Sequence, residues 1–63
     1  MLYDFLFELT EFSNNEGEQI LVECQTLNGA REILRHNGFC DDEVQFLCRM
    51  SVEEGEMLGY DTY

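Results

Sequence analysis

The chain is short and strongly acidic, and both properties narrow the functions open to it. It has 63 residues, and its 14 Asp and Glu residues outnumber three Lys and Arg, for a formal net charge of −11. Direct nucleic-acid binding is disfavoured because neutralising phosphates needs clustered Lys and Arg, and an anionic membrane would repel the chain. The length allows one domain, residues 1–63, and 44% hydrophobic residues is more than a disordered chain contains.

The N-terminal part predicts a β-hairpin. Residues 2–12, LYDFLFELTEF, alternate between apolar and mixed positions, and residues 19–26, QILVECQT, do the same. Residues 13–18, SNNEGE, are typical of a hairpin loop. The predicted inward side chains are Tyr3, Phe5, Phe7, Leu9, Ile20, Val22 and Cys24. The first strand also carries Leu6, and the second Leu21, on the opposite face.

A helix is predicted next, over residues 29–37, GAREILRHN. Asn28 precedes it as an N-cap, and its apolar residues are spaced to share one face. Gly38 stands where a left-handed residue would end the helix.

The last third predicts a strand followed by a helix. From residue 43 to 50 the pattern again has period two, with Val44, Phe46, Cys48 and Met50 on one face and Leu47 on the other. Ser51, followed by Glu54, matches a capping box and predicts a helix over 52–60.

These elements predict a small α+β fold in the order β-β-α-β-α, with a three-stranded, mostly antiparallel sheet and two helices. The third strand is expected beside the first and parallel to the second, with both helices on one face. The other face would then carry Leu6, Leu21 and Leu47, which are either partly covered by the last helix or form a dimer interface.

Acidic residues are concentrated at the hairpin and in the last third. Residues 1–18 contain five acids and no base, and residues 41–63 contain seven acids and one Arg, whereas 19–40 are neutral. Carboxylates at strand or helix spacing can imitate the charge repeat of a DNA strand. Tyr60 is added as a low-entropy interface anchor. The predicted protein-binding residues are Glu16, Glu18, Asp41, Asp42, Glu43, Glu53, Glu54, Glu56, Tyr60 and Asp61.

Neither a metal site nor a catalytic site is predicted. The possible zinc ligands, Cys24, His36, Cys40 and Cys48, lack the C-x₂-C spacing of zinc knuckles, so core cysteines are the better interpretation and no cofactor is expected. No catalytic motif is present, and so small a chain offers little room for a pocket, which argues against an enzyme. Three cysteines cannot all pair within the chain, and the start lacks the basic region of a signal peptide, so a reducing cytoplasm is expected.

In size, acidity and lack of a catalytic motif, the chain resembles the small inhibitors encoded by phages and mobile elements, including anti-CRISPR and other DNA-mimic proteins. The resemblance covers the composition of the whole chain and no motif. It implies a stoichiometric inhibitor that occupies the basic groove of a nucleic-acid-binding protein in the host cytoplasm, such as a CRISPR effector. The alternative is a homodimeric interaction module in which acid serves solubility, and the sequence leaves both open.

Overall fold

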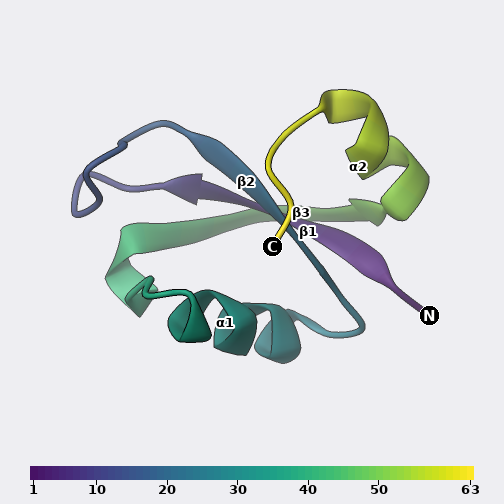
Figure 1. Cartoon of the computed structure of the whole chain (residues 1–63), viewed down its shortest axis with the longest axis horizontal. Coiled ribbons are helices and arrows are strands. Elements are labelled where there is room, and N and C mark those ends of the chain that lie inside the picture. The colour runs from purple at the N-terminus through teal and green to yellow at the C-terminus, as the bar shows by residue number, and fades with distance from the viewer.

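The computed structural model describes all 63 residues and confirms the predicted α+β order β-β-α-β-α (Figure 1). The elements are β1 (Tyr3–Leu9), β2 (Gln19–Cys24), α1 (Leu27–His36), a short 3₁₀ turn η1 (Asp41–Glu43), β3 (Val44–Ser51) and α2 (Val52–Leu58).

The strands form one antiparallel sheet in the order β2-β1-β3. The central strand β1 pairs with both neighbours, so that Tyr3 lies opposite Cys24 on one side and Ser51 on the other. β3 therefore runs parallel to β2 with β1 between them, as the sequence predicted. α1 makes the crossover that joins these two outer strands.

One face of the sheet packs against α1 and forms the main core. Phe7, Ile20 and Val22 are almost completely buried there, beneath Ala30 and Leu34 of the helix. Tyr3, Cys24 and Phe46 pack at the margin of this core. The alternation of β1 and β2 that predicted inward side chains is confirmed on this face.

The prediction that both helices share a face is wrong, because α2 lies on the opposite face from α1 (Figure 1). Gly55 of α2 approaches Asp4, whose side chain points away from that of Phe5. Leu6 and Leu21, on the same side as Asp4, are 8% and 0% exposed. Because α1 packs on the opposite face of the sheet, it cannot bury these leucines. α2 and the C-terminal segment that follows it lie on the same side as Leu6 and Leu21 and shield them from solvent.

A β-bulge in β3 changes which residues share a face. Leu6 pairs with Cys48 but Phe7 pairs with Phe46, so Leu47 is an extra residue between two ladder pairs. One inserted residue reverses the alternation beyond it. The prediction that Val44, Phe46, Cys48 and Met50 lie on one face is therefore wrong, and Cys48 is exposed instead of inward.

The two edges of the sheet differ. Beyond β2, the C-terminal segment adds a short parallel strand, in which the Tyr63 N–H donates to the Leu21 carbonyl at 2.8 Å and the Leu21 N–H donates to the Asp61 carbonyl at 2.9 Å. Beyond β3, no backbone hydrogen bond involves the outer side of the strand. Only the β3 edge is open.

Helix boundaries agree with the prediction to within two residues. α1 begins two residues early, because the hydroxyl of Thr26, not Asn28, accepts the hydrogen bond from the Gly29 N–H at 3.1 Å. Gly38 has a φ of 92°, the left-handed conformation predicted at the end of this helix. Ser51 caps α2 by accepting from the Glu54 N–H at 3.2 Å, as predicted. The Glu54 side chain does not return a hydrogen bond to complete the predicted capping box, and α2 ends at Leu58, two residues before the predicted end at residue 60.

Candidate functional site

The three arginines neutralise very little of the acidic surface. Only Arg35 forms an ion pair, with its Nε 2.9 Å from Oδ1 of Asp41. Arg49 instead lies over the ring of Tyr3, with Cζ 4.3 Å from the centroid, and Arg31 lies 5.7 Å from the centroid of Phe7. With 14 Asp and Glu residues, three arginines and a single ion pair, 13 of the acidic side chains have no ion-pair partner.

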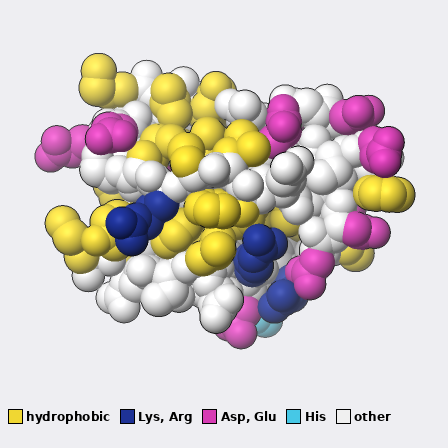
Figure 2. Space-filling view, turned by 180° about the vertical axis from the view of Figure 1, so that it is seen from behind, with side chains coloured by type: hydrophobic (Ala, Val, Ile, Leu, Met, Phe, Trp, Pro, Cys, Tyr) yellow, Lys and Arg dark blue, Asp and Glu magenta, His cyan; other side chains and the backbone are white.

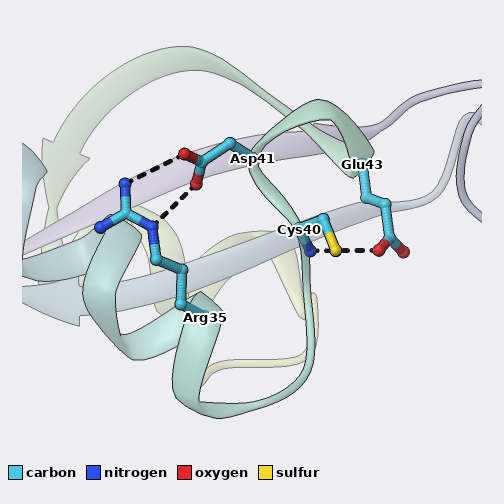
Figure 3. A network of polar contacts seen from close by, with 4 residues as sticks. All are labelled: Arg35, Cys40, Asp41 and Glu43. Carbon is cyan, nitrogen blue, oxygen red and sulfur yellow. Dashed lines mark hydrogen bonds and ion pairs between the residues drawn. The ribbon is translucent and has the colours of Figure 1, made fainter.

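The polar contacts around η1 involve two of the predicted binding residues (Figure 3). Asp41 accepts two hydrogen bonds from the guanidinium of Arg35, and this partner lowers the pKa of the Asp41 carboxyl. The Glu43 carboxylate accepts a hydrogen bond from the Cys40 N–H at 3.1 Å. Hydrogen bonding to Glu43 and its negative charge raise the pKa of the Cys40 thiol. Asp41 and Glu43 therefore have partners within the chain. The carboxylate of Asp42, which is exposed like that of Asp41, has no ion-pair partner.

A first group of acidic side chains lies at the hairpin end. Glu16 and Glu18, both predicted, are exposed in the loop. Glu8, Glu11 and Glu16 line a hollow of about 420 Å³. Phe12, at the same hollow, is 66% exposed. We call Glu8, Glu11, Glu16 and Glu18 the hairpin acids.

Sequence reasoning missed Glu8, Glu11 and Phe12 as members of this surface. It extended the first strand to residue 12, which placed Phe12 on a sheet face, but β1 ends at Leu9. The position of these residues in the sequence could have indicated this. Glu8 lies near the end of the first strand and Glu11 and Glu16 lie in the connection to the second strand, and a hairpin brings these parts of the chain close together.

A second group lies at the other end of the sheet, on α2 and the segment that follows. Glu53, Glu54 and Glu56 are exposed on this helix. We call these three the α2 acids. Tyr60 is 39% exposed beside them, and the side chain of Asp61 is exposed although its carbonyl is bound to β2.

The two groups lie apart on the molecular surface. Seen from behind, Asp and Glu side chains lie mostly around the margin of the molecule, whereas hydrophobic side chains occupy much of the middle (Figure 2). The molecule is 30 Å long. Acidic side chains are thus largely absent from the middle of this side.

One carboxylate is buried away from both groups. Asp4 is 3% exposed, and its Oδ1 has no hydrogen-bond partner. Burial raises the pKa of Asp4, and the negative charges of Glu23 and Glu56 raise it further. Gly55 closes over this side chain, so Asp4 does not face a cleft and cannot meet a substrate.

The predicted dimer residues are separated by the fold. Leu6 and Leu21 are buried inside the monomer and cannot form an interface. Leu47, at the bulge, is 38% exposed at the open edge of β3.

The cysteines lie in three separate places. Cys24 is half-buried on β2, Cys40 precedes η1, and Cys48 is exposed on β3. No group of three or more His, Cys, Asp or Glu side chains is arranged to hold a metal ion. No helix combines the length and apolar character needed to cross a membrane.

Comparisons with protein families, curated proteins and solved structures found no match to this chain.

Proposed function

We propose that this protein binds the basic groove of a nucleic-acid-binding protein and inhibits it by excluding the nucleic acid. The observation that carries the proposal is the lack of internal neutralisation: Asp41 is the one acid in an ion pair, although the chain contains three arginines. Unpaired carboxylates on a small surface produce a strong negative potential that attracts a cationic partner and speeds association.

The hairpin acids and the α2 acids are the surfaces assigned to this contact. A Lys or Arg side chain entering the hollow beside Glu8, Glu11 and Glu16 would meet carboxylates and could lie on the ring of Phe12. Tyr60 offers a comparable aromatic contact beside the α2 acids. Asp41 and Glu43 are less suited, because each would exchange an existing partner for a new one.

The resemblance to phage-encoded inhibitors supports the class of partner, a nucleic-acid-handling protein of the host such as a CRISPR effector. An acidic surface of this kind needs no cofactor and no catalytic group to act, since it competes by occupancy. Its binding should weaken steeply as salt is added, because the charges are exposed and screened.

The test compares variants of equal net charge. One variant carries Glu53→Gln and Glu54→Gln, and a second carries Glu11→Gln and Glu16→Gln. The control carries Glu23→Gln and Glu32→Gln, which are exposed but outside both groups and outside the predicted binding residues.

The assay measures displacement of a fluorescent DNA duplex from each of a panel of purified basic DNA- and RNA-binding proteins, at low and high salt. We expect the wild type and the control to displace DNA from at least one of these proteins, and at least one of the two group variants to lose about tenfold or more in affinity. Absence of displacement from every protein of the panel, or equal losses in all three variants, would contradict the proposal.

A further inference from the structure

The outer edge of β3 is the part of the sheet whose backbone has no partner. β1 lies on one side of β3, and no other backbone segment bonds to the opposite side. The equivalent edge of β2 is already covered by residues 61–63. An open edge presents N–H and C=O groups that another strand can pair with.

This edge occupies a broad side of the molecule. The C-terminal segment crosses in front of the strands in Figure 1, and it is bonded to β2, so β3 lies farthest from the viewer. The view from behind therefore looks onto β3, and hydrophobic side chains occupy much of the middle of that view (Figure 2). Leu47, Cys48 and Arg49 are the exposed residues at the centre of this strand.

β3 also lacks the charge that keeps copies of this protein apart. Its residues, VQFLCRMS, include no acid and one Arg, in a chain whose net charge is −11. Two such chains repel each other most weakly where no carboxylate faces the contact. The edge strand carries no Lys or Pro, and the features that oppose pairing with another strand are its bulge at Leu47 and the charge of Arg49.

We propose that two copies of this chain pair their β3 strands antiparallel about a twofold axis, which joins the two sheets into one of order β2-β1-β3-β3-β1-β2. A twofold contact uses the same surface on both copies, and an edge strand fits this requirement. Arg49 lies near the end of β3 and Glu43 just before its start, so antiparallel pairing brings Arg49 of each copy towards Glu43 of the other. In a parallel arrangement Arg49 would lie towards Arg49 of the other copy, and Glu43 towards Glu43.

The contact is expected to be small. The whole molecule measures 30 × 21 Å across this side, or about 600 Å² in projection, and β3 covers only part of it, whereas a standard stable interface buries about 800 Å² per partner. The contact is thus at the small end of specific interfaces, and the dimer is expected to exchange with the monomer.

Sedimentation velocity over an about hundredfold concentration range tests the proposal. Leu47→Lys places a charge at the centre of the contact, and Phe12→Lys makes the same chemical change at the hairpin end, on another exposed apolar residue. We expect the wild type and Phe12→Lys to dimerise, and Leu47→Lys to dimerise at least about tenfold more weakly.

Salt separates this inference from the proposed function. Added salt should strengthen the dimer, because it screens the repulsion between two acidic chains, whereas it should weaken binding to a basic partner. A wild type that stays monomeric at every concentration, equal losses in both lysine variants, or a dimer that dissociates on adding salt would overturn the β3 pairing and leave the proposed function untouched.

Hydrogen exchange of the wild-type chain supplies a readout that needs no variant. Protection of amides in residues 44–51 should rise with protein concentration, while that of the hairpin loop stays constant. Concentration-dependent protection elsewhere, with residues 44–51 unchanged, would refute the assignment of the interface to β3.

Discussion

The contact between Gly55 and Asp4 makes a prediction in which two known effects have opposite signs. Gly55 is within α2, and replacing a helical glycine by alanine usually stabilises a protein by about 1 kcal/mol. Here the added methyl group would lie 2.7 Å from Cγ and 3.0 Å from Cβ of Asp4. Since Cβ of Asp4 is fixed by the central strand, rotating the side chain cannot remove the whole clash.

The clash should win. Forcing a methyl group into a filled space costs about 1–3 kcal/mol, and α2 would have to move away from the face that it covers. Such a movement would also uncover Leu6 and Leu21, which are buried on that face. We expect Gly55→Ala to lower the free energy of unfolding by about 1–2 kcal/mol in spite of the better helix propensity.

Urea unfolding of a double-mutant cycle measures this effect. With Asp4→Ala in the background, the carboxylate is absent and only the 3.0 Å contact with Cβ remains, so Gly55→Ala should be clearly less destabilising than in the wild-type chain. If Gly55→Ala stabilises the wild-type chain, or destabilises both backgrounds equally, α2 does not pack on Asp4 as described.

Two further predictions concern Asp4 and the start of α1. Because the folded-state pKa of Asp4 is raised, protonation favours the fold, and the stability that this group contributes is lost as pH rises from the usual Asp range through the raised pKa. The side chain in Asp4→Asn stays neutral at every pH, so at pH 7 this variant should be more stable than the wild type by about 1 kcal/mol or more. Urea unfolding should show that the difference in stability disappears at about pH 3. A difference that stays constant with pH would contradict this. Thr26→Ala should lower the free energy of unfolding by about 1 kcal/mol, because it removes the N-cap of α1. Asn28→Ala, the matched control inside the helix, should change stability little in the same assay. If Asn28→Ala were the more destabilising of the two, Asn28 would be the cap.

Local patterns were enough to predict the fold class but not the layers. Alternation in β1 and β2 identified Phe5, Phe7, Ile20 and Val22 as inward residues, and they form the core. The position of α2 depends on which face of the sheet still exposes apolar side chains after α1 has packed. This is a property of the whole sheet and not of the α2 sequence. The buried Leu6 and Leu21 were the sequence signal, since each interrupts a face that otherwise carries charge.

The faces of β3 could not be predicted, because periodicity assumes an unbroken ladder. The register shift between Leu6 and Phe7 in the β1–β3 pairing places Cys48 and Met50 on the opposite face from Phe46. No residue in the sequence of β3, VQFLCRMS, indicates a bulge. The same limit applies to the candidate site. The sequence analysis listed Asp41 among the protein-binding residues, but its pairing with Arg35 depends on how α1 and η1 meet in space.

The two proposals have a joint physical consequence. In each copy the hairpin acids lie near the start of β3 and the α2 acids near its end. Antiparallel pairing of β3 would place the hairpin acids of one copy beside the α2 acids of the other, so two groups that are apart in one chain would become neighbours. Their mutual repulsion would oppose the dimer, and a basic partner that neutralised them would remove this opposition. Partner binding and dimerisation should therefore favour each other, to an extent that falls as salt screens the carboxylates.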